Sequence, residues 1–302
     1  MSWGVFMSWR TLLIQQKCHL SKKNGQLFCK RDDGVVSVPI EDITIIILET
    51  PQATITSSLL AELQEQNVVL ITCNGKHMPN GMLLPLLPHS RVSEVAFLQN
   101  QWSSPFRKRC WQKIVKAKIN NQARSLEISG RKSVSTLRQM ARRVQSGDPK
   151  NREAQAAREY WSSLMGDGFV RGATDFANNA LNYGYMVLRA VVARSLVSYG
   201  LLPCFGLHHD NNLNAFNLAD DILEPFRPMV DQAVMNILKS GGIKDDLSRD
   251  IRQEMALLAV QQVRINDEVQ TITNAADVTA YSLVNAIRDK DAALLKLPDF
   301  VI

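Results

Sequence analysis

Residues 102–128 read WSSPFRKRCWQKIVKAKINNQARSLEI, and this stretch marks a change from strands to helices along the chain. Phe106, Cys110, Ile114 and Ala117 recur at intervals of three or four residues, which is the spacing of one helix face. The lysines and arginines lie largely on the other faces. The stretch therefore predicts a basic amphipathic helix, and it decides the fold because strand signals nearly vanish after it.

The residues before this helix have the signature of strands joined by turns. Asn24-Gly25, between two apolar runs, predicts a hairpin, and only residues 57–66 have helical spacing. Other short strands are expected at residues 10–15, 35–38, 43–48 and 68–72. A linker is expected where the strand pattern is broken by the prolines at positions 79, 85 and 88. These signals predict a β-rich N-terminal domain over residues 1–92.

The residues after it predict helices to the end of the chain. Residues 179–198 are dominated by apolar and small side chains, so we expect a central buried helix there, whereas residues 232–238 and 246–263 are typical of outer helices. Two more helices are expected over 133–144 and from residue 151 onward. The prediction is an α+β protein with two domains, the second being all-α over residues 93–302. A length of 302 residues is sufficient for two separate cores.

The positive charge is concentrated in one block. The whole chain has a formal charge of +6, but residues 101–150 hold thirteen basic and only two acidic residues. Such a block is typical of a surface that binds nucleic acid backbone, although a merely solvated helix face is the alternative. The candidate DNA-binding residues are Arg107, Lys108, Lys113, Lys116, Arg124, Arg138, Arg142 and Arg143.

Several classes of protein are disfavoured by the sequence. The five cysteines are odd in number and scattered without a Cys-x-x-Cys pair, which argues against disulfides and zinc. No apolar run reaches the roughly 18 residues of a membrane span, and the N-terminus lacks the features of a signal peptide. A soluble, cytoplasmic protein is therefore expected. Met1-Ser2-Trp3 is echoed by Met7-Ser8-Trp9, so either methionine could be the natural start.

A candidate metal site lies in residues 206–212, GLHHDNN, and residues 219–228, ADDILEPFRP. Imidazole and carboxylate groups together can hold Mg²⁺ or Mn²⁺ with positions left for water and phosphate. Asp221 and Glu224 would share one helix face, and Pro225 and Pro228 predict a break or kink beside them. The alternative is ordinary surface chemistry, in which acidic residues in a first helical turn match the helix dipole.

Four ordered motifs give the chain a close resemblance to the CRISPR adaptation integrases, above all to those of type II systems. They are NREAQAAR at 151–158, NALNYGY at 179–185, GLHH at 206–209 and DILEPFRP at 221–228. The resemblance implies that Glu153, His209 and Glu224 are the catalytic residues and the metal ligands. Asp221 and His208 take supporting roles: Asp221 matches an acid that lies close to the site in many relatives, and His208 falls where the family is variable.

The resemblance also implies a fold, an activity and partners. The N-terminal domain would be β-sandwich-like and would dimerise, and the helical domain would be catalytic. With Mg²⁺ or Mn²⁺, the 3′-hydroxyl of a short incoming DNA would attack phosphodiesters at the CRISPR repeat. The expected partners are double-stranded DNA with 3′ single-stranded ends, repeat DNA, a second copy of the chain, a small ferredoxin-like adaptation subunit and the type II RNA-guided effector nuclease.

Two other functions stay open at this stage. A metal-dependent nuclease acting on branched or single-stranded DNA would use the same residues, because hydrolysis differs only in that water attacks the phosphodiester. A non-catalytic DNA-binding scaffold would not need the acidic and histidine positions. For the neighbouring residues we expect structural roles: Arg227 pairs with an acid, Arg189 and Arg194 are structural, and Tyr160, Trp161, Tyr183 and Tyr185 belong to a core or an interface.

Overall fold

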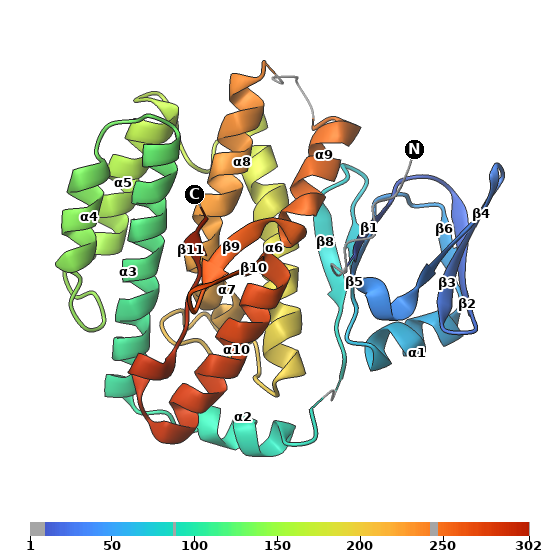
Figure 1. Cartoon of the computed structure of the whole chain (residues 1–302), viewed down its shortest axis with the longest axis horizontal. Coiled ribbons are helices and arrows are strands. Elements are labelled where there is room, and N and C mark those ends of the chain that lie inside the picture. Colours follow the sequence, from blue (N-terminus) through green and yellow to red (C-terminus); the bar gives the residue numbers. More distant parts are fainter. Residues whose placement is uncertain (1–9, 87–88, 242–246, 302) are drawn as a thin grey trace. The chain divides into compact units, whose positions relative to one another are not determined.

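The computed structural model describes residues 10–86, 89–241 and 247–301, in two compact units, Met1–Pro88 and His89–Ile302 (Figure 1). Both the N-terminal methionine at position 1 and the alternative start at Met7 lie outside the described residues. The first unit is rich in strands and the second in helices, so the predicted fold class is confirmed. No helix in the described part of the chain is long and apolar enough to cross a membrane. The five cysteines all lie in that part and form no disulfide.

The first unit contains two four-stranded sheets with one helix, α1 (Ser57–Glu65). One sheet has the order β1 (Arg10–Ile14), β5 (Ile43–Leu48), β7 (Val69–Cys73) and β8 (Pro79–Leu83). The other has the order β4 (Gly34–Pro39), β3 (Gln26–Arg31), β2 (Cys18–Lys23) and β6 (Ala53–Ile55). Its core joins side chains of both sheets and of α1, for example Leu20, Ile46 and Leu59.

The expected hairpin is present. Lys23 pairs with Gln26, and both Asn24 and Gly25 have positive φ, as a two-residue turn between twisted strands requires. The expectation that Pro79 belongs to a linker was wrong, because Pro79 begins β8 and pairs with Cys73. Proline is tolerated there because β8 is an edge strand and Pro79 is its first residue.

The second unit is built mainly from helices around two long ones, α3 (Ser104–Ile128) and α6 (Phe176–Ser198). Ser103 caps α3 by accepting the N–H of Phe106, and Pro105 occupies its first turn, where its missing N–H costs nothing. The predicted central helix is confirmed, since α6 is buried along most of its length. The other helices are α2 (Val92–Asn100), α4 (Val134–Arg142), α5 (Arg152–Met165), α7 (Asn217–Leu223), α8 (Arg227–Lys239), α9 (Arg249–Ala256) and α10 (Ile272–Asp289).

Two expectations about the outer helices were wrong. Helix α8 is mostly buried, and its polar residues have partners there: Asp231 accepts from Tyr160, and Gln232 accepts from Ser125. The second expected helix, 246–263, begins at a residue outside the described part and gives way to β9 (Gln262–Ile265). Together with β10 (Glu268–Thr271) and β11 (Asp299–Phe300), β9 forms a three-stranded sheet that the all-α expectation missed.

Candidate active site

Glu153 is placed by the first turn of α5. Asn151, in the left-handed region, accepts the N–H of Ala154, and the carboxylate of Asp148 accepts the N–H groups of Arg152 and Glu153, each at 2.9 Å. These acceptors satisfy donors that the start of a helix leaves without partners. The side chain of Glu153 therefore leaves a fixed turn, and α5 packs beside α3 (Figure 1).

Glu224 lies where α7 and α8 are interrupted. Residues Glu224–Phe226 form a 3₁₀ turn between the two helices, which is the break that Pro225 and Pro228 predict. Asn121 on α3 fixes the turn by donating to the carbonyl of Pro225 at 2.8 Å. Glu224 is 5% exposed and pairs with Arg227 at 2.8 Å, so the expected acidic partner of Arg227 is confirmed.

Lys118 on α3 joins the two glutamates. Its Nζ lies 2.6 Å from Oε1 of Glu153 and 2.5 Å from Oε2 of Glu224. Burial disfavours the charged forms of Glu224 and Lys118, but the opposite charges nearby outweigh this effect. Arg227 and Lys118 lower the pKa of Glu224 to about 2, and the carboxylates of Glu224 and Glu153 raise the pKa of Lys118. Glu224 and Lys118 are therefore both charged at neutral pH. Lys118 could not be singled out from the sequence, because it is one of many lysines in the basic helix.

The histidine loop is organised by Asp221. Its carboxylate is fully buried and accepts the backbone N–H groups of Leu207, His208 and His209. It also lies 2.6 Å from Nδ1 of His209, and this hydrogen bond, with nearby negative charge, raises the pKa of His209 in spite of partial burial. The ring is thereby oriented through Nδ1, which leaves Nε2 for another partner.

His208 and Asp221 thus have roles distinct from that of His209. The ring of His208 stacks on Trp111 of α3, with centroids 4.2 Å apart and planes 4° from parallel. Asp221 faces the histidine loop, whereas Glu224 faces Lys118 and Arg227, so the two acids act on different groups although they are three residues apart.

The donor atoms of this site are of the chemical types that bind a hard divalent cation. Two carboxylates converge on one positive group, Lys118, and the charge of Glu224 contributes to the raised pKa of His209. Carboxylate oxygens with water suit Mg²⁺ and Mn²⁺, and an imidazole nitrogen can complete such a set. Among residues 10–86, 89–241 and 247–301, however, no three His, Cys, Asp or Glu side chains are already grouped closely enough to hold a metal ion. Glu153 and Glu224 instead share the ammonium of Lys118.

Behind the glutamates lies a buried polar network. Asp231 accepts the hydroxyls of Tyr160 and Tyr185, and burial raises its pKa to about 7 although these hydrogen bonds oppose the rise. Arg227 lies over the ring of Tyr185, 4.6 Å from its centroid. Tyr160, Tyr183 and Tyr185 are buried, as expected for core aromatics. Arg189 and Arg194 are structural as well, since they pair with Asp220 and Asp277.

The candidate DNA-binding residues fall into two groups. Arg107 donates to the carbonyl of Leu207, and Lys113 donates to the carbonyls of Ala293 and Leu295, so both are engaged inside the protein. The other candidates lie toward solvent: Lys108 and Arg143 are exposed, and Arg124 and Arg138 share Glu127 as a partner.

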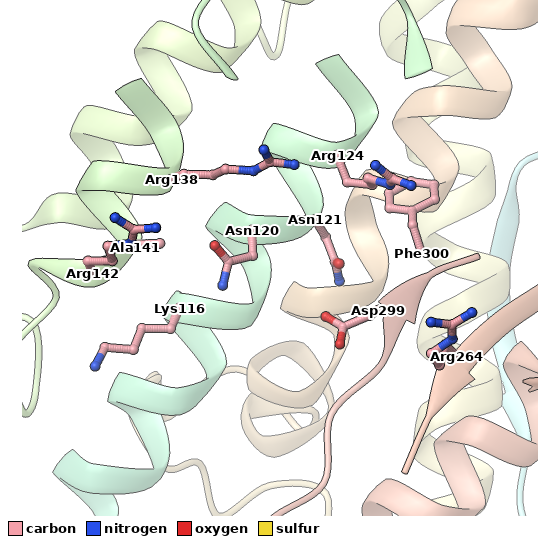
Figure 2. Close-up of a pocket in the computed structure, with 10 residues that line it drawn as sticks. All are labelled: Lys116, Asn120, Asn121, Arg124, Arg138, Ala141, Arg142, Arg264, Asp299 and Phe300. Atoms are coloured by element: carbon pink, nitrogen blue, oxygen red, sulfur yellow. The ribbon is translucent and has the colours of Figure 1, made fainter. Parts of the chain in front are cut away.

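A basic groove of about 590 Å³ brings four of the candidates together (Figure 2). Lys116 and Arg124 project from α3, Arg138 and Arg142 from α4, and Arg264 from β9. Arg264 lies outside the basic block of the sequence and was therefore missed. The groove and the glutamate site use different faces of α3, because Lys116 and Lys118 are two residues, about 200°, apart around the helix.

Comparisons with known proteins identify a family for this chain. The sequence profile of the family described as CRISPR associated protein Cas1 matches residues 11–270. The CRISPR-associated endonuclease Cas1 of Neisseria meningitidis serogroup C (strain 8013) is 40% identical over 296 residues, which are 98% of this chain and 97% of that protein.

Two solved structures share the fold. A casposase bound to its integration product superposes with a TM-score of 0.77 at 19% identity, covering 93% of this chain and 91% of that chain. A chain of a Cas6-RT-Cas1–Cas2 complex superposes with a TM-score of 0.74 at 19% identity, covering 98% of this chain and 37% of that chain. The chain therefore belongs to the family of CRISPR associated protein Cas1, and it is a CRISPR-associated endonuclease.

Proposed function

We propose that Glu153, His209 and Glu224 are the catalytic centre at which the 3′-hydroxyl of a short incoming DNA attacks a phosphodiester of the CRISPR repeat. A new bond from the 3′ oxygen to phosphorus forms while the bond to the target's own 3′ oxygen breaks, and that oxygen leaves with a proton. The observation that carries the proposal is the convergence of Glu153 and Glu224, from separate elements, on one positive group beside the histidine loop.

In this proposal the same three residues would hold Mg²⁺ or Mn²⁺ with their carboxylate oxygens and an imidazole nitrogen. A bound metal of this kind makes the attacking hydroxyl more acidic and neutralises charge on the phosphate. The chain's residues supply the fixed geometry: Asp148 and Asn151 hold the turn of Glu153, Asn121 holds the turn of Glu224, and Asp221 orients His209. Fixed geometry makes a large contribution to such a transfer, because it holds the reacting groups in line.

DNA backbone is proposed to bind the basic surface without sequence readout. The groove formed by Lys116, Arg124, Arg138, Arg142 and Arg264 has positive charge from three elements, as Figure 2 shows, with Asp299 as the acidic residue on its lining. Lys108 and Arg143 extend this charge over the neighbouring surface. Such contacts bind phosphates and position a duplex rather than select its sequence.

The proposed assembly follows from the proposed reaction, which joins two DNA molecules. We infer a homodimer that works with the small ferredoxin-like adaptation subunit, on double-stranded DNA with 3′ single-stranded ends. One structure of similar fold is a Cas6-RT-Cas1–Cas2 complex, which supports a partner of this kind. In a type II system, the RNA-guided effector nuclease is a further proposed partner.

The test is a joining assay with purified chain, partner subunit and Mn²⁺. Glu153→Ala, His209→Ala and Glu224→Ala should each abolish joining while leaving DNA binding largely intact, and EDTA should silence the parent protein. Full joining by one of these variants would remove that residue from the centre. Shortened strands without joined product would instead favour the nuclease alternative, in which water attacks.

A further inference from the structure

Lys118 is a buried charge to which the proposed chemistry gives no role. Its side chain is only 12% exposed, and its ammonium lies between the carboxylates of Glu153 and Glu224. Burying an ammonium is costly unless it is paired, so these contacts hold the side chain in place. Both of its partners are proposed metal ligands, and the ammonium occupies the point where the two carboxylates converge.

A cavity lies beside this ammonium. The cavity, of about 170 Å³, adjoins the site and is lined by Lys118, Gln122, Glu224, Asp231 and neighbouring residues. Gln122 is one turn along α3 from Lys118, so the two side chains lie on the same helix face. Gln122 is 3% exposed, and its Oε1 has no hydrogen-bond partner among the described residues. A buried amide oxygen without a donor is unfavourable, and an ammonium would satisfy it.

We propose that Lys118 is an internal competitor for the metal: its ammonium bridges Glu153 and Glu224 until a divalent cation displaces it toward Gln122 and Asp231. This inference rests on the proposed metal site. Without a positive group the two carboxylates would repel each other, so Lys118 keeps them together and ready. The same contact weakens metal binding, because the cation must first replace the ammonium.

The test measures Mn²⁺ affinity in DNA-free protein by calorimetry. Lys118→Met keeps the length of the side chain and removes its charge. An adjacent positive charge changes the proton affinity of a carboxylate at least about tenfold, so Mn²⁺ should bind the variant at least about tenfold more tightly. Gln122→Leu removes the proposed second location of the ammonium and should weaken Mn²⁺ binding several-fold. The two variants thus shift the affinity in opposite directions.

Lys113→Met is the matched control, because Lys113 is a half-buried lysine on the same helix that contacts the carbonyls of Ala293 and Leu295 instead of the glutamates. It should leave Mn²⁺ affinity unchanged. Thermal unfolding adds a second readout: Lys118→Met should unfold at a lower temperature than the parent without metal and gain more from added Mn²⁺.

The outcomes separate the inference from the proposed function. Equal Mn²⁺ affinity in the parent and Lys118→Met, with loss of binding in Glu153→Ala, would overturn the competitor role and keep the metal site. Weaker binding in Lys118→Met would also overturn it. Absence of Mn²⁺ binding in the parent and in Lys118→Met alike would overturn the metal site and the inference together.

Discussion

Nδ1 of His209 lies 2.6 Å from Oδ1 of Asp221, and this one carboxylate also accepts three backbone N–H groups of the histidine loop. Asp221 is fully buried, so it has no water to replace these donors. The orientation of the His209 ring and the path of its loop therefore depend on the same side chain. A proposed metal ligand that is held in this way by a second residue is sensitive to changes in that residue.

We expect Asp221→Asn to disturb His209 more than its small change in size suggests. The amide nitrogen cannot accept a hydrogen bond, so part of the loop loses its acceptor, and joining should fall by about 10-fold to 100-fold. The negative charge that raises the pKa of His209 is also lost. An NMR titration should therefore find a lower pKa for His209 in the variant than in the parent.

The same substitution has a defined dependence on pH. Because the folded pKa of His209 is raised, its ion pair stabilises the folded state fully below the ordinary value of about 6.5 and loses this effect as pH rises through the folded value. The stability difference between parent and Asp221→Asn should thus be larger at acidic than at alkaline pH. A difference that stays constant with pH would show that the pair contributes nothing beyond the backbone hydrogen bonds.

The two neighbouring histidines should respond differently to alanine substitution. His208 stacks on Trp111 and makes a packing contact, whereas His209 is oriented by Asp221. His208→Ala should retain most joining activity, and His209→Ala should lose it, in the same assay with partner subunit and Mn²⁺. Activity in His209→Ala with loss in His208→Ala would exchange their roles.

Some of the site could be predicted from local sequence because its determinants are local. Pro225 and Pro228 impose the break at Glu224, and Asn24-Gly25 imposes its hairpin, since these residues restrict or permit particular backbone angles. Glu153, His209 and Glu224 were selected through motifs in a recognisable order. Their surroundings depend on residues that are distant in the sequence.

Lys118, Asn121 and Arg264 illustrate what local sequence could not predict. Lys118 belongs to a helix with many lysines, and only packing against α5 and the Glu224 turn gives it two carboxylate partners. Arg264 joins the groove through β9, a short strand in a region with helical spacing. Lys113 and Lys116 are only three residues apart on α3, and they differ in what lies against them: Lys113 donates to the carbonyl of Leu295, whereas Lys116 lines the groove.

This difference between the two lysines gives a sharp test of the DNA surface. Lys116→Ala, Arg142→Ala and Arg264→Ala combined should weaken binding to unrelated duplexes about equally. The slope of log K against log salt should lose up to roughly 3 units, about 1 for each lost phosphate contact. Lys113→Ala is the control: it should keep the slope and lower the unfolding free energy by about 1 kcal/mol, because it removes hydrogen bonds from two carbonyls. An unchanged slope in the triple variant would exclude the groove as the path of the DNA.

Asp231→Asn tests the buried network behind the glutamates. Burial raises the pKa of Asp231 to about 7, well above the ordinary value of about 3.9 for an unfolded chain. Between these values the unfolded chain has released its proton and the folded chain has kept it, so unfolding becomes easier as pH rises. The slope is roughly 1.4 kcal/mol per pH unit for a single group, and the effect is complete above the folded pKa.

The asparagine variant carries no proton to release, so its stability relative to the parent should improve from pH 5 to pH 8, as measured by denaturant unfolding. Glu254→Gln, on an exposed side chain, should show no such trend. Parallel pH profiles for parent and Asp231→Asn would mean that Asp231 is already ionised inside the fold, with its charge balanced by Arg227 and Lys118.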